Sequence, residues 1–104
     1  MITIDVATFS QTPFGRYAQD SDFSAEKFRD TVLIPAIQGS HGEDVEVDFS
    51  KVALGVGSSF LEEAFGGLVR KGFDKKELIA HIRVKDRIGI YDKQVKKFIQ
   101  EARA

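Results

Sequence analysis

Hydrophobic and polar residues alternate in three stretches of the chain, which is the pattern of strands with one buried face. The clearest stretch covers residues 45–49, where valine and phenylalanine alternate with acidic residues. Residues 2–6 and 78–84 alternate in the same way, and residues 14–17 predict a further short strand after a proline-containing turn. The acidic face of the 45–49 strand is expected to be solvated or to meet basic side chains.

A strong amphipathic helix is predicted to begin at Ser59 and to end before Gly72. Ser59 and Glu62 have the spacing of a capping box, and a glycine is a common helix stop. Gly66 and Gly67 lie inside this helix and cost about 1 kcal/mol each relative to alanine, which favours a close approach of another helix or of the sheet. The apolar positions at helical spacing are Phe60, Leu61, Ala64, Phe65, Leu68 and Val69.

Two further helices complete the pattern. One is capped by Ser24 and is expected to end, kink or restart at Pro35, and the other covers residues 90–103. Strands that alternate with helices predict an α/β fold whose later strands are parallel. We expect a single domain over residues 1–104, with a mixed sheet of about four to five strands and helices mainly on one face.

Composition and charge exclude several classes of protein. The 15 basic and 16 acidic side chains nearly balance, whereas a general nucleic-acid binder needs a basic excess to neutralise phosphates. The chain has no cysteine, so it has no disulfide, thiolate metal site or cysteine nucleophile. No apolar run approaches the ~20 residues that span a membrane, and the N-terminus lacks the features of a signal peptide. We therefore expect a cytoplasmic protein with no cofactor, nucleic-acid partner or membrane association.

The most informative segment joins the 45–49 strand to the following helix and contains Gly57, Ser58, Ser59 and Phe60. A helix N-terminus exposes unpaired N–H groups and the positive end of the dipole, which favour an anion or a phosphorylated serine. The simpler interpretation is that the glycines form a turn and Ser59 caps the helix. Both interpretations fit the residues.

The same segment resembles the strand–turn–Ser-Ser–helix element of STAS domains, the modules of anti-sigma factor antagonists. It resembles more closely the STAS-like domains of the DUF4325 family. The resemblance is carried by Val45-x-Val47-Asp48-Phe49-Ser50 and by Gly57-Ser58-Ser59-Phe60-Leu61-Glu62-Glu63-Ala64-Phe65-Gly66-Gly67-Leu68, and upstream by Gly15-Arg16-Tyr17 and Ser24-x-Glu26-x-Phe28-Arg29.

The resemblance implies a STAS-like fold and a non-enzymatic regulatory protein that binds a partner protein, such as a serine kinase or an ATPase-like regulator. In STAS domains that antagonise anti-sigma factors, a partner kinase phosphorylates a serine or threonine at this helix start and thereby releases the partner. By this resemblance, the candidate for phosphorylation in this chain is Ser58, with Ser59 as the alternative. Partner or anion contacts are expected at Gly57, Ser58, Ser59, Phe60 and Glu63. The usual pattern is Asp-Ser-Ser-Gly-Leu, so this chain lacks its acidic residue and has Phe60 in place of its glycine.

Other residues carry weaker signals. His41 and His81 lack the paired spacing of metal ligands. Glu62 and Glu63 are neighbours on a helix, so their side chains diverge by about 100° and do not form a facing pair of carboxylates. The charged residues Arg16, Asp20, Asp22, Glu26 and Arg29 are interpreted as a solvated surface with weak ion pairs, and the alternative is a charged rim around the Ser58 turn. We assign no catalytic residue and no metal ligand.

Two functions of different classes remain. The first is a partner-binding regulator, and the alternative is a sensor of a small anion or nucleotide that binds at Gly57–Phe60. A first strand at the edge of the sheet would permit a weak homodimer, and otherwise the protein is expected to be a monomer.

Overall fold

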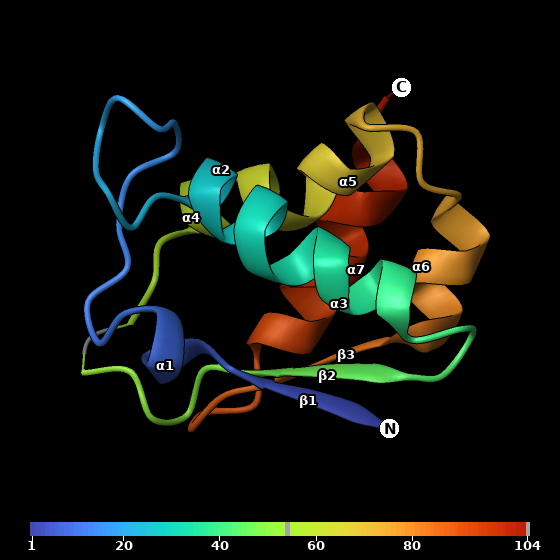
Figure 1. Ribbon diagram of the computed structural model, residues 1–104, viewed down its shortest axis with the longest axis horizontal. Coiled ribbons are helices and arrows are strands. Elements are labelled where there is room, and N and C mark those ends of the chain that lie inside the picture. Colours follow the sequence, from blue (N-terminus) through green and yellow to red (C-terminus); the bar gives the residue numbers. More distant parts are fainter. Residues whose placement is uncertain (54, 104) are drawn as a thin grey trace.

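The computed structural model describes residues 1–53 and 55–103, and these residues contain one parallel sheet of three strands. The strands are β1 (Ile2–Asp5), β2 (Val45–Asp48) and β3 (Ile82–Lys85), in the order β1-β2-β3 (Figure 1). In register, Ile2 lies beside Val45, which lies beside Ile82. The expected α/β class and the parallel pairing are confirmed, but the sheet is neither mixed nor four- to five-stranded among these residues.

The strand predicted at residues 14–17 is wrong, because this segment belongs to a long loop. Gly15 has φ +88°, outside the strand region of backbone conformations. The loop backbone bonds to its own far end: the Phe14 N–H donates to Phe23, and Ala25 and Glu26 donate to Gly15 and Arg16. The segment therefore folds back on itself and adds no strand to the sheet.

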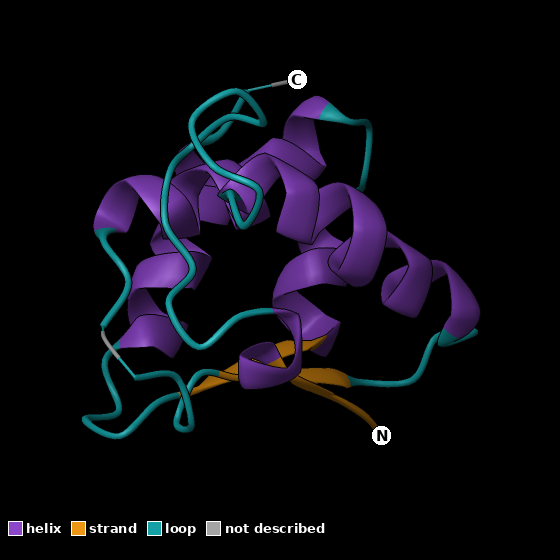
Figure 2. Ribbon diagram, turned by 60° about the vertical axis from the view of Figure 1, so that its left-hand side comes forward, coloured by secondary structure: helices purple, strands orange, loops and turns teal. Residues whose placement is uncertain are grey.

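The helices lie on one face of the sheet, as expected, and the other face is left uncovered (Figures 1 and 2). Each strand lies beside the strand that precedes it in the sequence. The β1–β2 and β2–β3 crossovers step in the same direction, so two right-handed crossovers place their helices on the same face of the sheet. The helical segments are α1 (Val6–Phe9), α2 (Ala25–Phe28), η1 (Arg29–Leu33), α3 (Ile34–Gly39), α4 (Ser58–Leu61), η2 (Glu62–Gly66), α5 (Gly67–Arg70), α6 (Lys75–His81) and α7 (Tyr91–Glu101), where η marks a π-helical turn.

The first crossover helix runs from α2 through η1 to α3, and Pro35 does not end it. Its predicted cap is confirmed, because the Ser24 hydroxyl accepts a hydrogen bond from the Lys27 N–H at 3.2 Å. Within η1 the Ile34 N–H bonds to the Arg29 carbonyl, five residues earlier. This wider turn immediately precedes the proline, so Pro35 occupies the start of α3, where a missing N–H and a fixed φ are tolerated.

The second crossover helix runs from α4 through η2 to α5 and confirms the helix predicted from Ser59 to Gly72. It ends at Gly72, which has φ +99°.

The strand predicted over 78–84 is only half correct, because residues 75–81 form α6. The Asp74 carboxylate caps this helix by accepting a hydrogen bond from the Lys76 N–H at 3.2 Å. Leu78 and Ile82 are four residues apart, so their spacing fits a helix as well as a strand.

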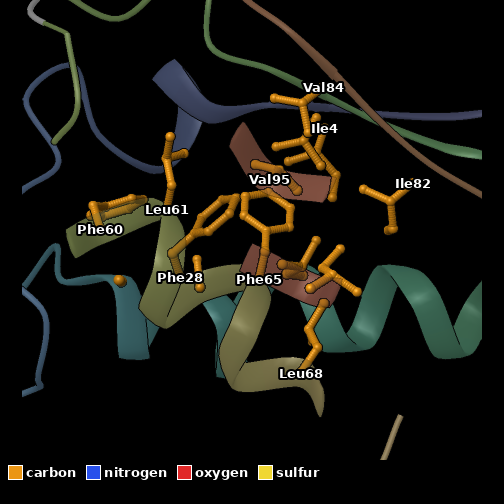
Figure 3. Close-up of a cluster of buried hydrophobic side chains, with 14 of the residues drawn as sticks. Ile4, Phe28, Phe60, Leu61, Phe65, Leu68, Ile82, Val84 and Val95 are labelled. Atoms are coloured by element: carbon orange, nitrogen blue, oxygen red, sulfur yellow. The ribbon is translucent and has the colours of Figure 1, made fainter. Parts of the chain in front are cut away.

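The core lies between the sheet and its helices (Figure 3). The covered face of the sheet carries Ile4, Val47 and Val84, which are at most 8% exposed. Against this face pack the buried helix side chains Phe28, Leu61, Phe65, Leu68, Val95 and Ile99.

The uncovered face of the sheet is polar. The alternate strand positions there are Thr3, Asp5, Glu46, Asp48, Arg83 and Lys85. The register places Glu46 beside Arg83 and Asp48 beside Lys85. The acidic residues of β2 therefore meet basic side chains of β3. Among the described residues, no helix is long and apolar enough to cross a membrane.

Candidate functional site

Three loops lie at the carboxyl ends of the strands, and hydrogen bonds join them to one another. They cover residues 10–24, residues 49–53 with 55–57, and residues 86–90, and they lie at the left of Figure 1. The Ala53 N–H bonds to the Gln11 carbonyl at 2.7 Å, which joins the first loop to the second. Arg87 donates to the Ser50 carbonyl at 2.7 Å and joins the third loop to the second. In parallel α/β folds, the carboxyl end of the sheet is where binding residues collect.

Ser58 and Ser59 follow the second of these loops at the start of α4, and both are exposed. Gly57 is the N-cap and supplies no side-chain hydrogen bond to the helix. The predicted capping box is therefore wrong, because the helix begins at Ser58 and the Glu62 carboxylate is bound to arginines instead. Both hydroxyls are accessible to a modifying enzyme or a partner.

Phe60 and Glu63 do not lie on the surface where partner contacts were expected. Phe60 is 2% exposed, and its ring packs 6.1 Å from Phe28 and 6.5 Å from Phe49, measured between centroids. Glu63 is 7% exposed and accepts a hydrogen bond from Arg29 at 2.6 Å. Helical periodicity explains both, because a wide apolar stripe turns these positions inward while Ser58 and Ser59 stay outside. The Phe60 ring therefore belongs to the core, and the Glu63 carboxylate is bound to Arg29.

Arg16, Arg29, Glu62, Glu63 and Arg70 form a connected arginine–glutamate cluster behind Ser58. Arg16 lies 2.6 Å from Glu62, and Arg70 lies 2.7 Å from the other oxygen of the same carboxylate. Arg29, which is 4% exposed, lies 2.6 Å from Glu63 and also donates to its backbone carbonyl. The solvated surface predicted for residues 16–29 is therefore wrong at Arg29. Its partner is 34 residues away in the sequence, and no local spacing signals it.

Three members of the cluster lie on two π-helical turns. Arg29 opens η1, and Glu62 and Glu63 open η2. The predicted close approach of another helix is confirmed only at Gly67, where a Cβ would meet the Arg29 side chain. A Cβ on Gly66 would instead meet Glu62, four residues earlier on the same helix. The glycines leave room for the charged groups of the cluster.

The cluster favours the charged forms of Glu62 and Arg29. The hydrogen bond from Arg70 lowers the pKa of Glu62 below its ordinary value of 4.5; burial opposes this shift, and Arg16 adds to it. Burial lowers the pKa of Arg29, but hydrogen bonds to Asp30 and Glu63 outweigh it, and the net pKa is raised. Glu62 and Arg29 are thus both ionised at neutral pH.

Acid is expected to weaken the cluster through Glu62. Because the folded pKa is lowered, the stabilisation is complete above pH 4.5 and is lost as the pH falls through the folded pKa. Glu62→Gln should lower the free energy of unfolding by about 1 kcal/mol at pH 7, and this difference should shrink below pH 4.5. Urea unfolding between pH 3 and 7 measures it. Glu101→Gln, an exposed carboxylate on α7, controls for net charge, and a difference for Glu62→Gln that is independent of pH contradicts the prediction.

Large apolar side chains are exposed on two of the three loops. Phe14 is 60% exposed, Tyr17 45% and Phe23 44%, all on the loop of residues 10–24. Ile88 and Ile90 are 78% and 44% exposed on the loop of residues 86–90. The exposure of these residues is not evident from local patterns, although the sequence does place three aromatic residues in a segment rich in polar side chains. We call these five residues together with Ser58 and Ser59 the carboxyl-end surface.

The two histidines lie at the opposite end of the sheet. His41 precedes β2 and is exposed, and His81 ends α6 just before β3. The His81 Nδ1 lies 3.0 Å from Asp44, and its Nε2 lies 3.5 Å from Glu77. Because the strands are parallel, residues before β2 and β3 are separated from Ser58 by the length of the sheet. Within residues 1–53 and 55–103, no group of three or more histidine or acidic side chains is arranged to hold a metal ion.

Comparison with known proteins identifies one family. No curated protein and no solved structure matches the chain. One family model, described as a STAS-like domain of unknown function (DUF4325), matches residues 24–87. The match covers the first crossover helix, β2, the Ser58–Ser59 turn, the second crossover helix and β3. The chain is therefore a member of the STAS-like DUF4325 family, as its sequence motifs indicate.

Proposed function

We propose that this protein is a non-enzymatic regulatory module that binds another protein through the carboxyl-end surface. One observation carries the proposal: of the six large hydrophobic residues exposed in the described chain, five lie on loops at the carboxyl ends of the strands, and three of these, Phe14, Tyr17 and Phe23, lie on the single loop of residues 10–24. Exposed apolar side chains that gather in one region mark sites of protein interaction, and phenylalanine and tyrosine are enriched at interface cores. The partner is expected to be a serine kinase or an ATPase-like regulator, as the family resemblance implies.

Hydrogen bonds and packing hold the loop of residues 10–24 in a defined shape, which supports a binding role. The Phe14 N–H bonds to the Phe23 carbonyl at 3.2 Å, and the Phe23 ring packs edge-on against Phe9 at 5.8 Å. The Tyr17 N–H donates to Asp20 at 2.9 Å, and Arg16 anchors the loop to Glu62. A pre-shaped loop loses less conformational entropy on binding, so more of the contact energy contributes to affinity.

Phosphorylation of Ser58 is proposed to control this surface. A phosphate adds about −1.5 to −2 charges at neutral pH. Ser58 lies one helical turn before Glu62, so the two side chains share a helix face. The Glu62 carboxylate forms an ion pair with Arg16. A phosphate on Ser58 would compete with Glu62 for Arg16 and shift the loop that carries Tyr17. Ser59 is the alternative site because its hydroxyl is also exposed.

Anion sensing at Gly57–Phe60 is the second candidate function. The observation that favours it is the N-cap Gly57, which leaves the start of α4 without a side-chain hydrogen bond. Gly57, Ser58 and Ser59 are all exposed, so a bound anion would be screened by water and held weakly. A rise in melting temperature on titration with inorganic phosphate or nucleotides would favour the sensor over the interaction module.

Affinity capture from the lysate of the native cell tests the interaction module. Captured proteins are identified by mass spectrometry, and their affinity for each purified variant is then measured by calorimetry. Tyr17→Ser and Ser58→Asp are expected to weaken binding of the captured partner by about 10-fold or more, because each alters the proposed contact surface. Ser58→Ala should retain binding. The control is Lys76→Ser, an exposed change on α6.

The variants separate the parts of the proposal. Equal affinity for wild type, Tyr17→Ser and Ser58→Asp contradicts the proposed surface. If Tyr17→Ser loses affinity for the partner while Ser58→Asp and Ser58→Ala bind it equally well, the proposed surface is supported and the phosphorylation switch is contradicted. Phe60 is unsuitable for this test because its removal would open a cavity in the core.

A further inference from the structure

The two edges of the sheet differ in whether other parts of the chain bond to their outward backbone groups. Along β3, the outward Val84 N–H donates to Asp92 at 2.9 Å, and the Ile82 carbonyl accepts from Lys96 at 3.4 Å. Asp92 and Lys96 belong to α7 and are themselves 2.7 Å apart. Side chains of α7 thus occupy the hydrogen-bonding groups that another strand would need, which protects this edge.

The β1 edge has no such cover. The Ile2 N–H donates to the Asp44 carbonyl at 2.9 Å, so the backbone groups of Ile2 and Ile4 face β2. By the alternation of a strand, the backbone N–H and carbonyl of Thr3 point away from the sheet. Thr3 is exposed, and none of the described residues bonds to these two groups. An open edge with free donors and acceptors is a template for another strand.

A groove runs beside this edge on the helix side of the sheet. It has a volume of about 460 Å³ and is lined by Thr3, Ile4, Asp5, Thr8, Phe9 and Val32. Phe9 and Val32 are partly buried hydrophobic residues at the margin of the core. A strand added along β1 would place alternate side chains over this groove, and apolar side chains would fit its lining best.

The sequence of β1 is itself complementary to this groove and edge. Ile2-Thr3-Ile4 reads the same in both directions, so an antiparallel copy centred on Thr3 places Ile2 opposite Ile4 of the other copy and Ile4 opposite its Ile2. These β-branched pairs lie on the groove side, and the two Thr3 residues exchange N–H and carbonyl hydrogen bonds. No charged side chain within Ile2–Ile4 opposes the pairing.

We infer that a second copy of this chain occupies the β1 edge, in an antiparallel, two-fold symmetric pairing that joins the two sheets into one of six strands. The contact surface is isologous, as closed dimers require. It is short, because β1 has only four residues, so the dimer forms and dissociates with concentration. This inference does not rest on the proposed partner binding, which uses the carboxyl end of the sheet.

Sedimentation velocity tests the dimer. Wild type and Thr3→Val are expected to shift from monomer to dimer between about 10 μM and 1 mM, because valine keeps the outward N–H and favours strands. Thr3→Pro is expected to stay monomeric, since proline removes only the outward N–H and leaves the bonds to β2 intact. Circular dichroism confirms the fold of each variant. Wild-type protein that remains monomeric over this range, or Thr3→Pro that dimerises as wild type does, overturns the inference.

Cysteine cross-linking gives a second test that keeps the fold and the N–H. The chain contains no cysteine, so each variant carries a single thiol. Thr3→Cys places two thiols across the two-fold axis, where paired Cα atoms lie about 5.5 Å apart and a disulfide can form. Arg83→Cys is the control on the same face of the sheet but on β3. Faster oxidative dimer formation by Thr3→Cys supports the inference, and equal rates for the two variants overturn it.

Discussion

Replacement of Arg29 with methionine is expected to lower the free energy of unfolding by about 3–5 kcal/mol. Arg29 is 4% exposed and lies 2.6 Å from the Glu63 carboxylate, which is 7% exposed. Methionine fills most of the same space but leaves that carboxylate buried without its closest partner. Arg16 and Arg70, each 3.4 Å from Glu63, compensate only in part, so the loss falls at the lower end of this range. Urea unfolding at pH 7 measures the effect.

Two further variants isolate the cause. Arg70→Met removes a more exposed partner of the same cluster and should cost about 1 kcal/mol. Arg29→Met combined with Glu63→Leu should be more stable than Arg29→Met alone, because the double variant leaves no unpaired charge between η1 and η2. A loss for Arg29→Met no larger than that for Arg70→Met would show that the buried pair does not hold these turns together.

Gly67→Ala is expected to destabilise the protein by about 2 kcal/mol, although alanine favours a helix by about 1 kcal/mol over glycine. An added Cβ would lie 3.1 Å from the Arg29 Cδ and still closer to its guanidinium. Arg29 is buried and bound to Glu63, so it has no free space into which to move. The new methyl group therefore strains the same ion pair, and thermal unfolding measures the change.

The neighbouring glycine provides the matched control. A Cβ on Gly66 would meet the carboxylate of Glu62, which is the end of a flexible and partly exposed side chain. Rotation of Glu62 relieves the contact, and the gain in helix propensity offsets the weakened ion pair. Gly66→Ala should therefore change the free energy of unfolding by less than about 1 kcal/mol. Equal losses for the two variants would contradict the role assigned to Arg29.

The local patterns predicted most of the elements but not the number of strands. Alternation located β1, β2 and β3, the last as the second half of the pattern at residues 78–84, and helical periodicity located the segments from α4 to α5 and α7. Two errors have a common cause. Residues 14–17 and 78–81 satisfy a short alternating pattern, yet the backbone bonds of the first close a loop, and a cap at Asp74 makes the second helical. Short apolar runs do not distinguish these outcomes.

The candidate site was predicted in part. The motif around Ser58 and Ser59 led to the correct family and to two serines that the structure leaves exposed at a helix start. It also suggested surface contacts at Phe60 and Glu63, whose side chains point inward. The exposed Phe14, Tyr17 and Phe23 were not selected, because a sequence does not state which aromatic residues the core will cover.

What the sequence by itself determined is the set of local elements and the family, since both depend on periodicity, capping residues and short motifs along the chain. Only the tertiary structure decided which charges are buried, which sheet edge is open and which apolar residues remain outside. The physical reason is distance along the chain: Arg29 and Glu63 are 34 residues apart, and Arg16 and Glu62 are 46 residues apart. Such pairings are set by packing all the elements together, and no local spacing encodes them.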